Sequence, residues 1–441
     1  MDASSYFRGK KITVIGLGLL GRGVGDAQYL AECGAEIIVT DLKSREELAS
    51  SVAQLASFPN ITFVLGEHRL EDFRERDFIL KAAGVPLNSP YIAEAKKNGI
   101  PVRMSADLFM ELADITTVGV TGTRGKSTVT HMTYTILQAA GKKVLLGGNV
   151  RGVSTLALLP EVTPDTLAVL ELDSWQCQGL GEATLSPHIA IFTTLYPDHL
   201  NYYAEKPEQY LADKANIFLH QTDEDTFILG KQCAPTVIDR YGEAIQAKTL
   251  VVDELKLPDT WTLQIPGMHN RYNAALALAA ARTVGVEDDV SRSALESFRG
   301  VPGRLELIRE VEGVKVYNDT TATTPDATLA ALRALDTGTK NIILVMGGAD
   351  KNLDMHTLLY EVPNFVKRTI LLAGTGTNRV LEFLPEASVF DDLAKAVAEA
   401  FVAAVPGDVI LFSPAFASFG MFKNEYDRGD QFVTLVQAYE K

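Results

Sequence analysis

A seven-residue segment from Thr121 to Ser127, with the sequence TGTRGKS, constrains the fold of this 441-residue chain more than any other feature. An apolar, strand-like run precedes it at residues 115–120, and a helix-like run follows it at residues 129–140. The two glycines let backbone N–H groups close around phosphate oxygens, and the start of the helix adds a partial positive charge. The segment therefore predicts a strand, loop and helix of an α/β sheet that binds a nucleoside triphosphate.

Within this loop, we expect Lys126 to neutralise the β- and γ-phosphates and the hydroxyl of Ser127 to bind Mg²⁺. The other loop residues expected at the nucleotide are Gly122, Thr123, Arg124, Gly125 and Thr128. The spacing differs from the standard phosphate-loop pattern, because Val120 stands at the position of its first glycine. The alternative is a glycine-rich turn without a ligand, and the flanking strand and helix disfavour it.

Short apolar segments alternate with helical stretches along the chain, which indicates parallel sheets. The expected strands of the N-terminal part lie at residues 11–15, 36–40, 61–65, 77–80 and 101–104, with helices at 24–33 and 90–98. A second unit adds strands at 167–172 and 189–194 and helices at 207–220 and 271–284. A third has strands at 341–346, 368–373 and 408–412, after a Gly/Pro hinge at 300–303. We expect an α/β protein with three domains: an N-terminal Rossmann-like parallel sheet (1–112), a central P-loop ATPase-like domain (113–300) and a C-terminal Rossmann-like α/β domain (301–441).

Composition excludes several functional classes. The net charge is −15 without a basic block, so nucleic acid is not expected as a partner. The three cysteines are scattered and predict neither disulfides nor a metal cluster. No apolar stretch reaches ~18 residues, so we expect a cytoplasmic protein without membrane insertion.

A second glycine pattern, Gly16-x-Gly18-x-x-Gly21, follows the first expected strand, and Asp41 ends the second. This pattern is typical of dinucleotide binding, with the acidic side chain on a ribose hydroxyl. It also fits a tight turn that needs small residues, or a turn that binds another nucleoside diphosphate such as a UDP-sugar. The phosphate loop further along the chain favours the last interpretation.

Polar residues at other strand and helix ends are further candidates. Glu171 ends an expected strand and could bind Mg²⁺, while His199 follows another strand and by itself would more often be structural. Lys214 lies on an expected helix and by itself would be a solvated lysine. Asn270 could cap a helix or contact adenine. Two residues of the third unit could reach the nucleotide: Arg304 at a phosphate, and Asp319 at the ribose or the metal.

These residues resemble the Mur ligase family over nearly the whole chain. The resemblance rests on residues 16–21, 122–127, 147–149, 170–176, 198–199 and 269–270, together with Arg304, Asn318-Asp319 and residues 413–429. The N-terminal glycine turn and the segment Ser413–Gly429 resemble the member that adds D-glutamate to UDP-N-acetylmuramoyl-L-alanine. The resemblance implies that ATP phosphorylates the acceptor carboxylate to an acyl phosphate, which the amine of D-glutamate then attacks.

The resemblance also implies a role for each matching residue. Lys126, His199, Lys214 and Asn149 would act in catalysis, with Asn149 near the transferred phosphate and Lys214 carbamylated. Two Mg²⁺ ions would be held around Ser127, Glu171, His199 and Lys214. Asn270, Arg304 and Asp319 would contact ATP. The uridine diphosphate site would contain Leu19, Leu20, Leu42 and Lys43, and the D-glutamate site Thr323, Lys351, Ser418 and Phe419. A monomer is expected.

The chain departs from the family pattern at several positions. Thr321 replaces a substrate-binding lysine, Glu425 replaces an aromatic residue, and Leu42-Lys43 replaces a common Thr-Arg pair. The first two changes bear on amino-acid specificity rather than on reaction type. Three alternatives remain: another amino-acid ligase of the Mur and folylpolyglutamate superfamily, a nicotinamide-dependent oxidoreductase built on the first glycine turn, and a P-loop regulatory ATPase.

Overall fold

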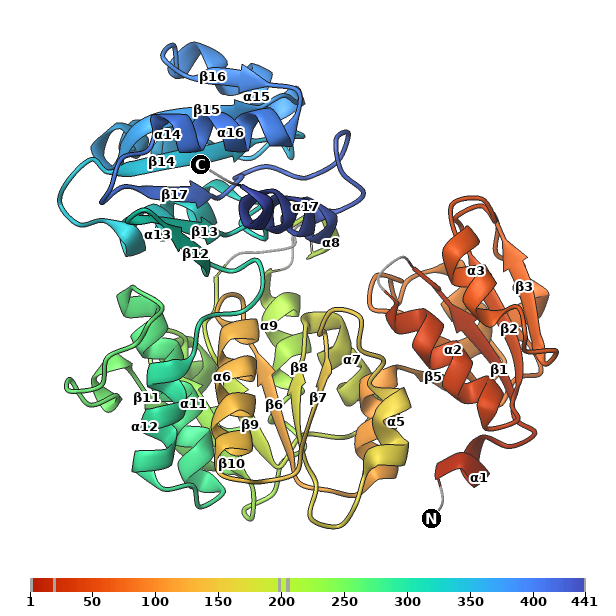
Figure 1. Ribbon diagram of the computed structural model, residues 1–441. Coiled ribbons are helices and arrows are strands. Elements are labelled where there is room, and N and C mark those ends of the chain that lie inside the picture. The colour runs from red at the N-terminus through yellow and green to blue at the C-terminus, as the bar shows by residue number, and fades with distance from the viewer. Residues whose placement is uncertain (1–2, 19–20, 197–199, 204–206, 440–441) are drawn as a thin grey trace. The chain divides into compact units, whose positions relative to one another are not determined.

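The computed structural model describes residues 3–18, 21–196, 200–203 and 207–439. The chain forms two compact units, one of Met1–Thr260 with Tyr272–Leu295, and one of Trp261–Arg271 with Glu296–Lys441. The described residues contain three sheets, each with helices between its strands (Figure 1). The expected α/β class is confirmed. In this described part of the chain, no helix is long and apolar enough to cross a bilayer.

The N-terminal sheet has the order β3-β2-β1-β4-β5, and all of its pairs are parallel. Its strands lie within two residues of the expected ones: β1 (Lys11–Ile15), β2 (Glu36–Asp41), β3 (Ile61–Leu65), β4 (Phe78–Lys81) and β5 (Val102–Arg103). Its helices are α1 (Ala3–Phe7), α2 (Arg22–Glu32), α3 (Ala49–Leu55) and α4 (Pro90–Lys97). The order reverses between β1 and β4, so ligands are expected beyond the carboxyl ends of these two strands.

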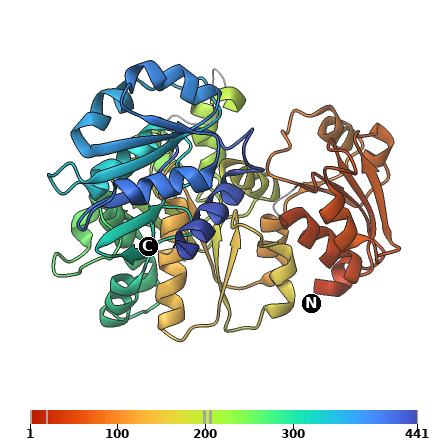
Figure 2. The same ribbon diagram turned by 45° about the horizontal axis from the view of Figure 1, so that its top comes forward.

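The central sheet is parallel, with the order β11-β10-β9-β6-β8-β7. Its strands are β6 (Thr117–Thr121), β7 (Val144–Gly148), β8 (Leu167–Glu171), β9 (Ile189–Phe192), β10 (Thr226–Gly230) and β11 (Lys248–Val252). The helices of this region are α5 (Ser105–Ala113), α6 (Lys126–Ala139), α7 (Ser174–Ala183), α8 (Leu200–Tyr203), α9 (Pro207–Ala215), α10 (Ala234–Tyr241), α11 (Met268–Thr283) and α12 (Asp288–Ser297). Helix α6 lies along the sheet (Figures 1 and 2), and β6 is buried at every residue. Because β8 and β9 flank β6, their carboxyl ends lie beside the phosphate loop.

The C-terminal sheet has the order β12-β13-β17-β14-β15-β16 and is mixed, because β12 runs antiparallel to β13. Its strands are β12 (Glu306–Val311), β13 (Val314–Asn318), β14 (Ile342–Gly347), β15 (Val366–Leu372), β16 (Ser388–Phe390) and β17 (Val409–Phe412), and its helices are α13 (Pro325–Leu335), α14 (His356–Phe365), α15 (Thr375–Val380), α16 (Leu393–Ala403) and α17 (Glu425–Ala438). The first hairpin was not expected from the sequence. Its turn, Glu312-Gly313, has positive φ at both residues, as a tight two-residue hairpin requires.

Two apolar clusters cover the two faces of this sheet. Leu329, Leu332 and Leu358 from α13 and α14 pack on one face, while Val397 and Phe432 from α16 and α17 belong to the cluster on the other. Strands that are covered on both faces are continuous apolar runs rather than alternating ones. This is why β14 and β17 could be located from the sequence.

Candidate active site

The phosphate loop joins β6 to α6 and is held by the end of β9. The backbone N–H of Thr123 donates to the carbonyl of Thr194 at 2.7 Å, and that of Arg124 donates to Thr194 Oγ1 at 2.9 Å. The hydroxyl of Thr193 donates to the carbonyl of Arg124 at 2.6 Å. These hydrogen bonds tie the loop to the end of β9, as a preorganised anion site requires.

Both loop glycines are required by close neighbours. Gly122 has φ +139°, and a Cβ there would overlap Thr193 Oγ1 and lie 2.9 Å from the Thr194 nitrogen. Gly125 has φ +87°, and a Cβ there would lie 2.5 Å from Asn273 Oδ1. Asn273 is buried on α11, so this helix closes the loop from a second side.

The charged and hydroxyl groups of the loop lie at the start of α6. Lys126 Nζ donates to the carbonyls of Gly122 and Thr123, at 3.1 and 3.2 Å, so its ammonium group lies over the loop. Ser127 is buried in the first turn of α6, Thr128 is half-buried, and Arg124 is exposed. The predicted loop residues Gly122–Thr128 therefore form the turn from β6 into the first turn of α6.

Glu171 and Asn149 meet at the ends of two neighbouring strands. The carboxylate of Glu171, at the end of β8, is 3% exposed and accepts a hydrogen bond from Asn149 Nδ2 at 3.4 Å. The Asn149 N–H donates to the Glu171 carbonyl at 2.7 Å, just after β7. These bonds leave most of the acceptor capacity of the carboxylate to a ligand, and carboxylate oxygens are ligands that Mg²⁺ prefers.

The described residues contain no group of three His, Cys, Asp or Glu side chains that could hold a metal ion. Mg²⁺ usually takes one or two carboxylates and fills its other positions with water and substrate phosphates. Ser127 and Glu171 fit such a site. His199, which was predicted as a further metal ligand, lies outside the described residues.

Lys214 on α9 is buried rather than solvated, with 1% of its surface exposed. Its Nζ donates to Thr121 Oγ1 at 3.2 Å and lies 4.9 Å from the ring centre of Tyr210. Thr121 is the last residue of β6, so this lysine reaches the base of the phosphate loop. Burial at that point separates Lys214 from ordinary surface lysines, a distinction that its position in the sequence did not reveal.

The predicted uridine diphosphate residues that the structure describes, Leu42 and Lys43, follow β2 beside the first glycine turn. Both carboxylate oxygens of Asp41 accept backbone N–H groups, from Gly18 at 3.1 Å and from Lys43 at 2.9 Å. Leu42 is 65% exposed and Lys43 is also exposed. Asp41 therefore ties β2 to the glycine turn. Leu19 and Leu20 lie outside the described residues.

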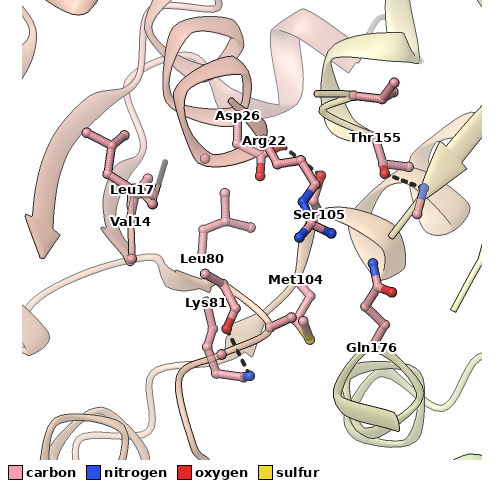
Figure 3. A pocket seen from close by; sticks show the side chains of 18 residues that line it. Val14, Leu17, Arg22, Asp26, Leu80, Lys81, Met104, Ser105, Thr155 and Gln176 are labelled. Carbon is pink, nitrogen blue, oxygen red and sulfur yellow. Dashed lines mark hydrogen bonds between the residues drawn. The ribbon is translucent and has the colours of Figure 1, made fainter. Parts of the chain in front are cut away.

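A cavity of about 200 Å³ opens beside this turn (Figure 3). Its wall includes Gly16 and Gly18 of the turn, Arg22 at the start of α2, Lys81 at the end of β4, and Gln176 on α7. The guanidinium of Arg22 donates to Asn149 Oδ1. One face of the cavity therefore reaches the residues that line the end of the central sheet.

Asp319 and Arg304 lie near one another in the second unit. Asp319 is buried at the end of β13, and accepts the hydroxyl of Ser413 at 2.7 Å and the N–H of Leu305 at 3.0 Å. Burial raises the pKa of this carboxyl to about 7, against the opposing effect of Ser413, Leu305 and Arg304. Arg304 is exposed. Asn270 belongs to the same unit, and its side chain donates to the carbonyl of Pro266 at 2.7 Å at the start of α11.

The predicted D-glutamate residues lie at the carboxyl edge of the C-terminal sheet. Lys351 Nζ donates to Thr323 Oγ1 at 2.8 Å, so these two side chains do meet. Ser418 is buried and Phe419 is 66% exposed. A residue that was not singled out, Arg428, is fully buried on α17.

Arg428 organises this edge through backbone and hydroxyl contacts. It donates to the carbonyls of Phe416 and Thr320, at 3.2 and 2.8 Å, and to Thr320 Oγ1 at 3.1 Å. Burial lowers its pKa to about 10. Thr193 and Thr194, which hold the phosphate loop through hydrogen bonds, were also missed. Their signal was a polar pair directly after an apolar strand, in a segment from which only His199 was selected.

Three family models match the chain. "Mur ligase MurD-like, N-terminal domain" matches residues 10–104, "Mur ligase middle domain" matches 120–256, and "Mur ligase, glutamate ligase domain" matches 303–416. Together these models span all three sheets.

Relatives and solved structures agree with these models. A UDP-N-acetylmuramoylalanine–D-glutamate ligase of Roseiflexus sp. is 39% identical over 98% of this chain and 99% of the relative, and that of Borreliella afzelii is 35% identical over 96% of each. The UDP-N-acetylmuramate-alanine ligase of Thermotoga maritima has the same fold, with a TM-score of 0.63 and 18% identity over 98% of this chain and all of that one. A MurF ligase of Thermotoga maritima, solved with ADP, gives a TM-score of 0.60 and 18% identity over 99% and 96% of the two chains. The chain belongs to the Mur ligase family.

Proposed function

We propose that this enzyme is an ATP-dependent ligase that adds D-glutamate to UDP-N-acetylmuramoyl-L-alanine in peptidoglycan precursor synthesis. The observation that carries the proposal is the phosphate loop with Glu171 and Asn149 at the adjacent strand ends, in a chain similar over its full length to ligases of that name. The match of the C-terminal region to a glutamate ligase domain disfavours an oxidoreductase or a regulatory ATPase, because neither activity would use that region.

In the proposed reaction, the γ-phosphoryl group of ATP passes to the alanine carboxylate, which gives an acyl phosphate and ADP. The amine of D-glutamate then attacks the acyl carbon, forms the amide and expels phosphate. Lys126 and the N–H groups of residues 122–127 would bind and orient the triphosphate, because phosphoryl transfer needs neutralised charge more than covalent chemistry from the protein. Two bound Mg²⁺ ions would supply further charge neutralisation at Ser127 and Glu171. Asn149 would orient the transferred group.

Lys214 is proposed to act as a carbamate, as the family resemblance implies. Its burial and its contact with Thr121 support a role at the phosphate loop rather than on the solvated surface. Carbamylation would turn a buried cation into an anion that can bind a metal. His199 is proposed as a further metal and catalytic residue on the resemblance alone.

The remaining sites are proposed from the matching positions. Leu19, Leu20, Leu42 and Lys43 would hold the uridine diphosphate, while Asn270, Arg304 and Asp319 would contact ATP. The D-glutamate site would contain Thr323, Lys351, Ser418 and Phe419. The contact of Lys351 with Thr323 supports a site that could hold a carboxylate. We further propose three domains, at residues 1–112, 113–300 and 301–441, and a cytoplasmic monomer.

Phosphate release is the test. The purified chain should release phosphate from ATP only when Mg²⁺, UDP-N-acetylmuramoyl-L-alanine and D-glutamate are all present. A panel of D- and L-amino acids tests the amine, for which the changes at Thr321 and Glu425 leave another amino acid as the alternative. Hydrolysis that needs neither the acceptor nor an amino acid would refute the ligase proposal.

A further inference from the structure

Lys81 is a buried lysine at the wall of the cavity beside the first glycine turn. It is the last residue of β4, is 3% exposed, and pairs in register with Ile15, which directly precedes the turn (Figure 3). Its Nζ donates to the carbonyls of Val85 and Ala82, at 2.9 and 3.2 Å. An ammonium group has three N–H donors, so one donor remains for a ligand.

No carboxylate of the described residues forms an ion pair with Lys81. Asp107 on α5 is paired instead with Arg103, at 2.6 Å, and Asp173 accepts the N–H of Gln176 as the cap of α7. Burial lowers the pKa of Lys81 to about 8, and Asp173 and Asp107 oppose this shift only from a distance.

The other charged groups that line the cavity do not neutralise Lys81 either. Asp26 on α2 accepts the hydroxyls of Ser154 and Ser105, at 2.6 and 2.7 Å, and burial raises its pKa. Arg22, at the start of the same helix, adds a second cation to the wall. The cavity of this strongly acidic protein is thus lined by two cations and by one carboxyl group whose charged form is disfavoured.

Burying a cation without an ion pair carries a desolvation cost, which hydrogen bonds to carbonyl groups offset only in part. Such a residue in a cavity therefore points to a ligand of opposite charge. We infer that Lys81 binds an anionic group of the acceptor, a phosphate or carboxylate oxygen, in this cavity. This inference rests on the proposed function, which supplies an acceptor with a diphosphate and a carboxylate.

Calorimetry on the full chain tests the inference, with UDP and UDP-N-acetylmuramoyl-L-alanine as ligands and without turnover. Lys81→Met should weaken acceptor binding by about 10- to 100-fold, the usual range for losing one hydrogen bond to a charged group. Lys97→Met, a change at an exposed lysine of α4, is the control and should have no effect. An equal loss for UDP and the acceptor would locate Lys81 at the diphosphate, and a loss for the acceptor alone would locate it at the carboxylate. Affinities equal to those of the control would overturn the inference.

A second measurement separates charge recognition from a structural role. Near pH 8 the wild-type chain should take up a fraction of a proton when the acceptor binds, because an anion raises the pKa of Lys81. Binding enthalpies in buffers of different ionisation enthalpy measure this uptake, which Lys81→Met should abolish and Lys97→Met should retain. Lys81→Gln replaces Lys81→Met if the latter does not fold. Uptake that persists without Lys81 would contradict the inference. Neither readout depends on turnover. If Lys81→Met weakens acceptor binding while the wild-type chain shows no ligase activity, the proposed reaction is refuted and the anion site is retained.

Discussion

Replacing Gly122 by alanine should disable the phosphate loop. The residue has φ +139°, where a side chain costs roughly 1–2 kcal/mol. The new Cβ would overlap Thr193 Oγ1 and lie 2.9 Å from the nitrogen and 3.0 Å from the oxygen of Thr194. Since those Thr194 atoms are backbone, the loop must move away from β9 to make room.

That movement would break the four hydrogen bonds that join Thr123 and Arg124 to Thr193 and Thr194. At about 1 kcal/mol each, they bring the total cost to about 5–6 kcal/mol. Gly141, at the end of α6, provides the matched control: its φ is +71° and nothing lies within 4 Å of its added Cβ. There the cost should be about 1 kcal/mol.

Nucleotide binding and thermal unfolding measure the difference. If about 3 kcal/mol of the cost falls on the ligand-binding form of the loop, Gly122→Ala should bind ADP roughly 100-fold more weakly than Gly141→Ala. Adding Thr193→Ala should recover only part of the affinity, because the Thr194 backbone still obstructs the Cβ. ADP affinity within about twofold of the control, together with an unchanged unfolding temperature, would show that the predicted clash at Gly122 does not occur.

Three further outcomes are expected. Glu171→Gln should lower kcat by about 10²–10³-fold, as loss of one charge-stabilising group does. It should also raise the Mg²⁺ concentration that gives half-maximal phosphate release. An unchanged Mg²⁺ titration would show that Glu171 is not part of the metal site. Lys214→Ala should lose turnover and recover part of it with added short carboxylates if a carbamate is the active group, and no recovery would leave that role unsupported. Asp319→Asn should gain stability relative to wild type as pH rises from about 4 to 7. In the folded wild type the pKa of this carboxyl is raised to about 7, whereas in the unfolded chain it ionises near 3.8. Ionisation between these pH values therefore favours the unfolded wild type, and the Asn variant does not undergo it. The gain should reach at most about 4 kcal/mol, three pKa units, and a urea-unfolding difference that does not vary with pH would contradict it.

Local patterns were sufficient for the elements that carry the site. β1, β6 and β8 are buried at nearly every residue and each contains a short apolar stretch, so each could be located from its own residues. The β12–β13 hairpin was missed because β12 is only partly buried and the turn depends on two positive φ values. The sequence by itself also placed Glu171 at the end of a strand.

Only the tertiary structure shows which distant residues contact the ends of these strands. Thr193 and Thr194 hold the phosphate loop because β9 is the spatial neighbour of β6, although some 70 residues separate them. Lys81, Lys214 and Arg428 resemble surface cations in the sequence and are buried in the fold. The physical reason is that apolar periodicity is a property of neighbouring residues, whereas burial and electrostatic environment depend on groups brought together from distant parts of the chain. The sequence by itself therefore determined the strands that carry the site, the phosphate loop and the family, and the tertiary structure decided which cations are buried at the sites.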